Sequence, residues 1–283
     1  MSERITFAGS IASELIESGA GSVIAVFDRS FYIGCDKSHE LLCCIGTSQL
    51  VHGPVNVITS LATLPSVAVN ARWYTEKEKL YIDGVERIDK SDYQLTPREQ
   101  CTNTNIIWPD GATVKYLSEL YSYKQSDNVV HNNLRARLQH GTDSLKMWLQ
   151  SGTKSVPDEL SELIGCGPGL TPSGDDILIG ALVALHYVGE YRAFDALAKW
   201  VRLHAPDATN RISLAHLHAA CQAMAVDPLH HFITALFSDK QNLPVTMEHL
   251  EAYGHRSGFD AGTGVLAVAD GLIGQSQQSR TFS

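Results

Sequence analysis

The sequence predicts an α+β fold in two parts: a β-rich domain over residues 1–125, built as an antiparallel sheet or small barrel, and a mostly α-helical domain over residues 126–283. Three observations support this prediction. The chain has 283 residues, above the roughly 250 at which a single core usually stops growing. Short apolar runs separated by turn residues occur up to about residue 130. Apolar residues at helical spacing follow from residue 132, so the local structure should change there.

The strand candidates of the first part are short apolar runs bounded by turn residues. They are residues 22–27, 30–33, 40–46, 55–58, 66–69 and 80–82. Asp83 and Gly84 read as a tight hairpin turn that leads into a further strand at residues 85–88. Residues 52–54 and 109–111 are two more breaks, and only residues 11–17 look helical in this part.

The helices of the second part follow from apolar residues at intervals of three, four and seven. The expected helices are residues 134–149 with a break at Gly141, a short one opened by Pro157, and residues 177–188, 191–204, 212–226, 228–237, 246–253 and 262–274. Residues 177–188 are apolar on nearly every face, so that helix should be deeply buried. The tail, residues 275–283, looks disordered.

Charge and composition exclude several functional classes. The net charge is −9 and no run of Lys or Arg could follow a phosphate backbone, so we expect no nucleic-acid partner. No apolar stretch is long enough to span a bilayer, and the first residues do not lead into a signal-peptide core. We therefore expect a cytoplasmic protein that does not bind membranes. The six cysteines are scattered without a CxxC pair, which favours buried free thiols.

The most informative segment is the glycine-rich stretch at residues 164–180, with the sequence IGCGPGLTPSGDDILIG. It fits neither the dinucleotide fingerprint, since Leu170 stands where a third glycine is needed, nor a phosphate loop, since Asp175 and Asp176 replace Lys and Ser/Thr. Glycines let main-chain N–H groups approach a ligand closely. The backbone at Gly165, Gly167, Gly169 and Gly174 is therefore predicted to bind substrate.

The polar residues of this stretch, Thr171, Ser173, Asp175 and Asp176, are the catalytic candidates. Two carboxylates here suit a cation or the N–H groups of an amide or carbamoyl ligand. The pair could hold a divalent metal, although the sequence offers no identifiable further ligands. In the alternative interpretation Ser173 is a helix N-cap and both acids only complement the helix dipole.

Two later polar segments also precede helices. In the first, Thr209 or Asn210 could cap a helix, and Arg211 could bind a carboxylate or phosphate. The second, residues 254–260, could hold an anion through its backbone amides, Arg256 and Ser257. The substrate-binding candidates of these two segments are Asn210, Arg211, His255, Arg256, Ser257, Gly258 and Asp260. As plain structure, Ser257 would cap the helix, Asp260 would complement its dipole and His255 would lie on the surface.

Other reactive side chains give weaker signals. Cys166 lies within the glycine-rich stretch and could be a nucleophile, but no base can be assigned and small-residue packing explains it equally. His216 and His218 diverge on a helix, and His230 and His231 are adjacent, so neither pair has good chelating geometry.

Three segments in this order resemble one family. The block GCGPGLTPSGDD at residues 165–176, NRIS at 210–213 and GHRSGFD at 254–260 are similar to AllH-like subunits of bacterial oxamate carbamoyltransferase. A β-rich opening with Val26–Phe27 and Gly53–Pro54 is also typical of that family. Arg256 stands where the family usually has Thr, and Phe259 where it usually has Trp.

The resemblance implies one subunit of a complex of three different proteins. Such a complex interconverts oxamate plus carbamoyl phosphate with oxalurate plus phosphate in anaerobic breakdown of allantoin and purines. The partners would be two other protein subunits and small anionic substrates.

A mechanism can be hypothesised from the residues themselves. Backbone N–H groups would stabilise the oxyanion, Arg211 and Arg256 would bind the anions, and Asp175 or Asp176 would orient the amide or act as a base. The alternatives are a stand-alone metal-dependent hydrolase of a small amide or phosphate, and a non-catalytic scaffold subunit.

Overall fold

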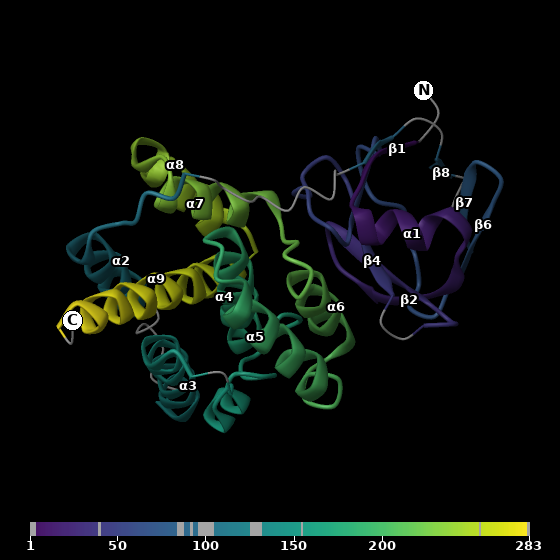
Figure 1. Cartoon of the computed structure of the whole chain (residues 1–283). Coiled ribbons are helices and arrows are strands. Elements are labelled where there is room, and N and C mark those ends of the chain that lie inside the picture. Colours follow the sequence, from purple (N-terminus) through teal and green to yellow (C-terminus); the bar gives the residue numbers. More distant parts are fainter. Residues whose placement is uncertain are drawn as a thin grey trace. The chain divides into compact units, whose positions relative to one another are not determined.

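The computed structural model describes residues 4–38, 41–83, 88–90, 93–95, 105–124, 132–153, 155–254 and 256–281. It has the predicted α+β fold, with a curled β-sheet followed by a helical region (Figure 1). The chain divides into two compact units, Met1–Glu99 and Gln100–Ser283. The sheet belongs to the first unit and the helices from α2 onward to the second.

The first unit is built around one mixed sheet. Its strands are β1 (Ile5–Ala8), β2 (Ala20–Val26), β3 (Ser30–Cys35), β4 (Leu42–Gly46), β5 (Asn56–Thr59), β6 (Arg72–Glu76), β7 (Lys79–Ile82), β8 (Ile88–Asp89) and β9 (Gln94–Leu95). The strand order is β8-β7-β6-β2-β3-β4-β5-β1-β9. Most neighbours are antiparallel, as predicted, but β4–β5 and β1–β9 are parallel pairs.

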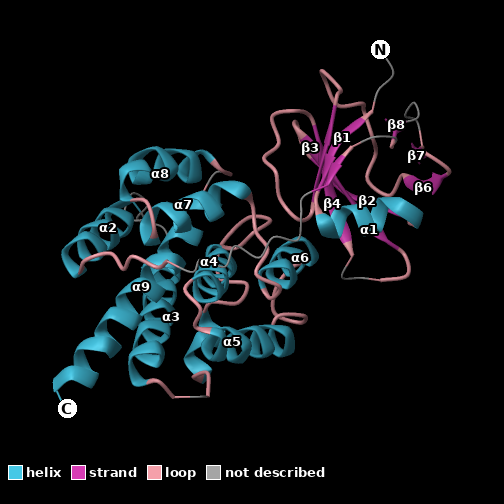
Figure 2. Ribbon diagram, turned by 45° about the horizontal axis from the view of Figure 1, so that its top comes forward, coloured by secondary structure: helices cyan, strands magenta, loops and turns pink. Residues whose placement is uncertain are grey.

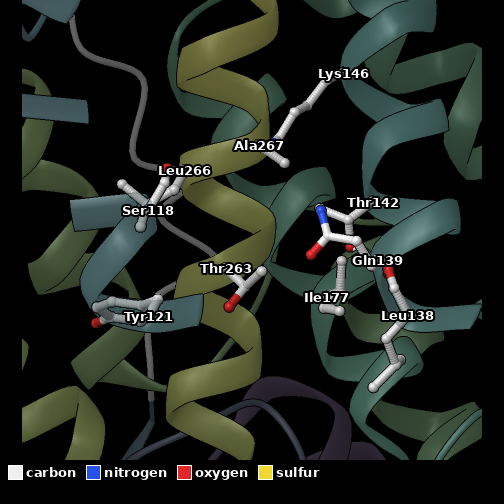
Figure 3. Close-up of a pocket in the computed structure, with 10 residues that line it drawn as sticks. All are labelled: Ser118, Tyr121, Leu138, Gln139, Thr142, Lys146, Ile177, Thr263, Leu266 and Ala267. Carbon is white, nitrogen blue, oxygen red and sulfur yellow. Dashed lines mark hydrogen bonds between the residues drawn. The ribbon is translucent and has the colours of Figure 1, made fainter. Parts of the chain in front are cut away.

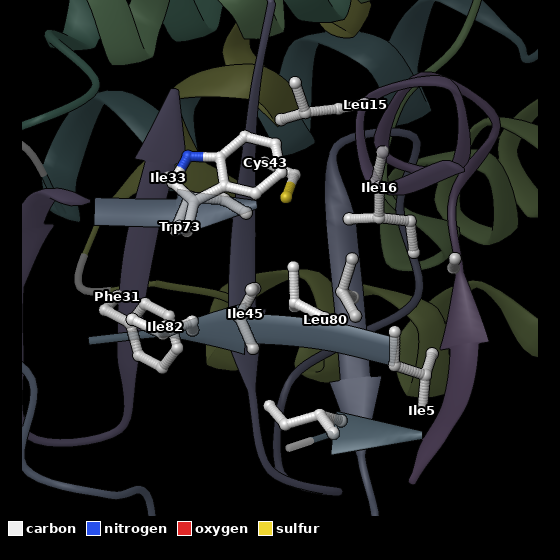
Figure 4. Packing of buried hydrophobic residues seen from close by; sticks show 14 of the residues in the cluster. Ile5, Leu15, Ile16, Phe31, Ile33, Cys43, Ile45, Trp73, Leu80 and Ile82 are labelled. Atoms are coloured by element: carbon white, nitrogen blue, oxygen red, sulfur yellow. The ribbon is translucent and has the colours of Figure 1, made fainter. Parts of the chain in front are cut away.

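Helix α1 (Ser10–Ser18) packs across this sheet against β4, β5 and β6 (Figure 2). Its apolar face meets a core that includes Leu15, Ile16, Phe31, Ile45 and Trp73, all nearly inaccessible to solvent (Figure 4). The alternation of buried and partly exposed residues along β2 and β3 is the pattern expected of strands with one face on the core. The described core of the first unit is therefore made by the sheet, α1 and a few loop residues such as Leu61 and Val67.

Several details of the sheet differ from the sequence prediction. The prediction missed β1, β6 and β9, and residues 66–69 form a loop rather than a strand. Pairing of β7 with β8 through Leu80 and Ile88 agrees with the expected hairpin, although the turn at Gly84 lies outside the described residues. The described cysteines are free thiols, four of them buried, and Cys101 also lies outside the described residues.

The second unit consists of helices packed around α4 and α9, the second of which Figure 1 shows in yellow. Its helices are α2 (Gly111–Lys124), α3 (Asn132–Ser151), α4 (Ser173–Tyr187), α5 (Tyr191–His204), α6 (Arg211–Ala220), α7 (Asp227–Phe237), α8 (Leu243–Ala252) and α9 (Ser257–Thr281), with short 3-10 helices η2 (Asp158–Glu162) and η3 (Lys240–Asn242). Every residue of α4 is buried, as its apolar sequence predicts. Within the described part of the chain, no helix combines the length and the apolar character needed to cross a membrane.

The helical boundaries correct four predictions. Helix α2 occupies a stretch predicted to contain no helix, and it packs against α9. Helix α3 continues through Gly141 and is not broken there. This glycine provides the space in which the Leu163 side chain packs against the helix. Helix α6 ends at Ala220 and not at Val226, and α9 continues to Thr281 through most of the tail expected to be disordered.

Candidate functional site

The glycine-rich loop joins η2 to α4, and its glycines are needed for its shape. Gly165, Gly167 and Gly169 have φ values of +67°, +134° and +100°, which side chains other than glycine rarely adopt. A Cβ atom on Gly165 would lie 2.1 Å from the carbonyl oxygen of Ala208, just before α6. One on Gly174 would lie 1.9 Å from the carbonyl oxygen of Leu163. The loop is therefore held closely against the segment that leads into α6.

Two of the four glycine N–H groups predicted to bind substrate are occupied within the protein. Gly165 donates to Asp175 Oδ1 at 2.8 Å, and Gly174 donates to the Cys166 carbonyl at 2.9 Å. These two amides are therefore not available to a substrate. Gly167 and Gly169 remain, and the stretch from Pro168 to Leu170 is exposed.

Asp175 connects the loop to the start of α6. Its Oδ1 accepts the Gly165 N–H, and its Oδ2 accepts the hydroxyls of Ser213, at 2.6 Å, and Thr209. The residue is 0% exposed. Burial raises the pKa of its carboxyl, and the hydrogen bonds from Ser213, Thr209 and Gly165 lower that pKa. Every described contact of this carboxylate points into the protein, so its evident role is to organise the loop.

Asp176, one residue further along α4, turns toward α9. It is only 5% exposed, and its Oδ2 is buried with no hydrogen-bond partner among the described residues. Burial and then the charge of Asp260 raise the pKa of Asp176 well above its usual range, while hydrogen bonds with the Ser257 and Thr171 hydroxyls lower it. Those two hydroxyls also contact each other at 2.7 Å. Asp176, Thr171 and Ser257 thus form one polar cluster between the loop and α9.

The start of α9 supplies the third segment of the site. Gly258 packs so tightly that a Cβ would lie 1.7 Å from the Leu250 carbonyl oxygen. Asp260 lies in the first turn of α9 and is 1% exposed. The Arg256 Nε lies 3.9 Å from Asp260 Oδ2, and the Arg256 side chain is about half exposed. His255, a predicted binding residue, lies outside the described residues.

The start of α6 is fixed by Asn210, which is its N-cap as predicted. The Asn210 side-chain oxygen accepts the N–H groups of Ile212 and Ser213 at 3.0 and 3.1 Å. Its Nδ2 donates to the Leu170 carbonyl at 2.9 Å, which ties α6 to the exposed part of the glycine-rich loop. Arg211 is the first residue of α6 and is partly buried.

Asn210 offers a matched pair of variants. We expect N210A to lower the free energy of unfolding by about 1 kcal/mol, because it removes the cap. N210D keeps the capping oxygen but replaces the donor to Leu170 with a carboxylate oxygen that repels the Leu170 carbonyl, so it should retain more stability than N210A and exchange amide hydrogens faster in the loop. Urea unfolding and hydrogen exchange measure the two effects. Equal stability of N210A and N210D would contradict the capping role.

The three predicted segments therefore meet at one loop. Asn210 and Thr209 join it to α6, and Ser257 joins it to α9. Residues 163–269 match the family model of the oxamate carbamoyltransferase subunit AllH. The AllH match begins just before the loop and ends within α9, so it contains all three segments, and the predicted AllH-like resemblance is confirmed over this range. No solved structure matches the chain.

The capping prediction for Ser173 is wrong. Helix α4 begins at Ser173, but its N-cap is Pro172 and no side chain caps it, because the extended backbone of Pro172 sets the helix start. Ser257 is the first residue of α9, and its hydroxyl contacts that of Thr171. Asp175 and Asp176 do lie in the first turn of α4, and Asp260 in that of α9. The sequence named Thr209 only as a cap and gave Ser213 no role, so their bonds to Asp175 were missed.

Burial and a backbone hydrogen bond characterise Cys166 and His230, two of the weaker candidates. Cys166 is buried, and that burial raises the pKa of its thiol, which favours the packing interpretation. His230 accepts a hydrogen bond from the Ala225 N–H through Nε2. Over the described ranges, no three His, Cys, Asp or Glu side chains group in a way that could hold a metal. The occupied oxygens of Asp175 leave the acid pair poorly suited to a divalent ion.

A small cavity lies elsewhere in the helical unit, between α2, α3, α4 and α9 (Figure 3). Its lining includes Ser118, Gln139, Thr142, Lys146 and Thr263, and none of its lining residues lies within residues 165–176, 210–213 or 254–260. The cavity has a volume of about 30 Å³, which is room for about two water molecules. It is too small for an organic substrate.

Proposed function

We propose that this chain is a cytoplasmic subunit of a carbamoyltransferase that interconverts oxamate plus carbamoyl phosphate with oxalurate plus phosphate in anaerobic allantoin and purine catabolism. The observation that carries the proposal is the convergence of three polar segments on one exposed glycine-rich loop within the AllH match. The AllH name denotes a subunit of oxamate carbamoyltransferase. We propose two other protein subunits as its partners.

The reaction requires donors for a developing oxyanion and cations for two anionic substrates. We assign the donor role to the N–H groups of Gly167 and Gly169, which make no described hydrogen bond within the protein. Arg211 and Arg256, at the starts of α6 and α9, would bind carboxylate or phosphate. The net charge of −9 makes these local cations the more important for anion binding.

The test is reconstitution of the three-protein complex and assay of phosphate-dependent conversion of oxalurate to oxamate and carbamoyl phosphate. Nuclear magnetic resonance of substrate labelled with carbon-13 at the ureido carbon follows both products. An active complex that needs this chain supports the proposal. A complex that keeps full activity without the chain contradicts it, and a tightly bound divalent ion would favour a metal-dependent hydrolase.

Arg256 gives a specific variant for this assay. We expect R256Q to raise the KM for the anionic substrate about tenfold, because a charge-assisted hydrogen bond contributes about 1.5 kcal/mol or more. The control is R192Q, which changes an exposed arginine on α5 outside the three segments. The same KM in wild type and R256Q would remove Arg256 from the binding site.

A further inference from the structure

The hydroxyls beside Asp176 offer fewer protons than its ionised form needs. Thr171 and Ser257 share a hydrogen bond of 2.7 Å, which uses one of their two hydroxyl protons. One hydroxyl proton is left, while Asp176 Oδ2 is buried with no hydrogen-bond partner among the described residues. A protonated Asp176 needs fewer donors and brings a proton of its own. The three groups can then form a closed ring in which each donates once and accepts once.

The surroundings of Asp176 favour this protonated form. The residue is only 5% exposed, and its Oδ2 has no hydrogen-bond partner among the described residues. The charged groups that face it are Asp175, on the same helix, and Asp260, on α9. The described cation beside Asp260 is Arg256, whose Nε lies 3.9 Å from Asp260 Oδ2. The Arg256 side chain is about half exposed. Asp176 itself has no cation among its described contacts, and burial beside a second carboxyl disfavours its ionised form.

The ring also leads toward the surface. Thr171 and Ser257 are partly exposed, and the exposed residues Pro168, Gly169 and Leu170 directly precede Thr171. A ligand at the loop could therefore touch these hydroxyls without reaching the buried carboxyl. Asp176 would then supply protons to the ligand through these hydroxyls.

We propose that Asp176 is held as a neutral carboxylic acid and that, through the Thr171 and Ser257 hydroxyls, it supplies the proton that the departing amide nitrogen needs in carbamoyl transfer. The second half of this inference rests on the proposed function; the first half does not. In this assignment the hydroxyls contact the substrate, and Asp176 positions them and renews their proton.

The proton and electron balance of the step is complete. A phosphate oxygen forms a bond to the ureido carbonyl carbon of oxalurate, and the bond from that carbon to the amide nitrogen breaks. The electron pair stays on the nitrogen, which takes a proton from one of the two hydroxyls and leaves as oxamate. Asp176 restores the hydroxyl proton and becomes a carboxylate. The proton released by the attacking monohydrogen phosphate then returns to Asp176.

Infrared difference spectroscopy tests the protonation directly. The spectrum of the whole chain at pH 7, wild type minus D176N, should contain the C=O stretch of a protonated carboxyl. In D260N that band should disappear at lower pH than in wild type, because the neighbouring charge is gone. A difference spectrum that shows only carboxylate bands at pH 7 overturns the proposal. If D176N does not fold, the titration of the band in wild type and D260N decides the question alone.

A linked measurement is the stability of D176N against pH. The folded-state pKa of Asp176 is raised, so the native protein holds a proton that the unfolded chain releases. Wild-type stability should therefore fall as pH rises from about 4 toward that raised pKa. D176N lacks the titration and should lose less stability over the same range. Parallel curves for the two proteins would contradict a neutral Asp176.

Activity of the reconstituted complex tests the proton transfer. Asparagine can donate and accept within the ring but cannot release a proton, so D176N should lower kcat about 100-fold with little change in KM. It should also remove the alkaline limb of the kcat profile. Unchanged kcat and profile would overturn the relay. A wild-type complex with no transferase activity would overturn the proposed function, while the infrared band would still assign the proton.

Discussion

Replacing Asp175 with alanine is expected to lower the free energy of unfolding by about 4 kcal/mol. The carboxylate accepts hydrogen bonds from Gly165, Thr209 and Ser213 and is fully buried. Hydrogen bonds to charged groups contribute about 1.5–3 kcal/mol each, and donors left buried without acceptors add a further cost. These bonds join the glycine-rich loop to α6, so the loop should also lose protection against hydrogen exchange.

A graded series checks this expectation. S213A removes one donor and should cost about 1.5 kcal/mol. D175N should fall between S213A and D175A, because its amide can still pair with the two hydroxyls. D158A, at an exposed acid in η2, should change stability by less than about 0.5 kcal/mol. Thermal and urea unfolding of the full chain, with hydrogen exchange over residues 164–172, measures these changes. A D175A protein as stable as D158A would contradict the organising role of Asp175.

The different contacts of Asp175 and Asp176 show how much of the site can be predicted from the sequence. Adjacent residues on an α-helix point about 100° apart, so the sequence predicts that the two carboxyls face different neighbours. It cannot name those neighbours, because α6 begins 36 residues after Asp175 and α9 begins 81 residues after Asp176. The three polar segments could be found one by one from their glycines, caps and charges. That they share one loop depends on tertiary packing.

The missed elements have similarly physical causes. Asp110 and Gly111 look like a turn, but Asp110 accepts hydrogen bonds from the N–H and hydroxyl of Thr113 and starts α2. Val114, Leu117 and Tyr121 then follow at helical spacing and are buried, a signal that the turn interpretation hid. The end of α6 was missed because no glycine follows the helix. Ala223 adopts the left-handed conformation that glycine usually takes there, with φ of +61°. Strand β9 has two residues, too few for any periodic pattern.

The contact between α4 and α9 gives the second large expected effect. A Cβ on Gly180 would lie 1.9 Å from the Ala261 carbonyl oxygen, and one on Gly264 would lie 2.0 Å from the Ile177 carbonyl oxygen. At both places a helix backbone touches the partner helix directly. A methyl group must push the helices apart, so we expect G180A and G264A each to lower the free energy of unfolding by about 3 kcal/mol. Ser257 and Asp260 on α9 face Asp176 on α4, so the same displacement should open the ring of hydroxyls and carboxyl.

The matched control is G274A, further along α9. Its Cβ would meet only the side-chain end of Gln150, which can move, and alanine favours a helix by about 1 kcal/mol over glycine. G274A should therefore be neutral or slightly stabilising, although the substitution is chemically the same. In the infrared experiment G264A should weaken the protonated-carboxyl band and G274A should leave it unchanged. If all three alanine variants unfold at the same urea concentration as wild type, close packing of α4 on α9 does not hold the site together.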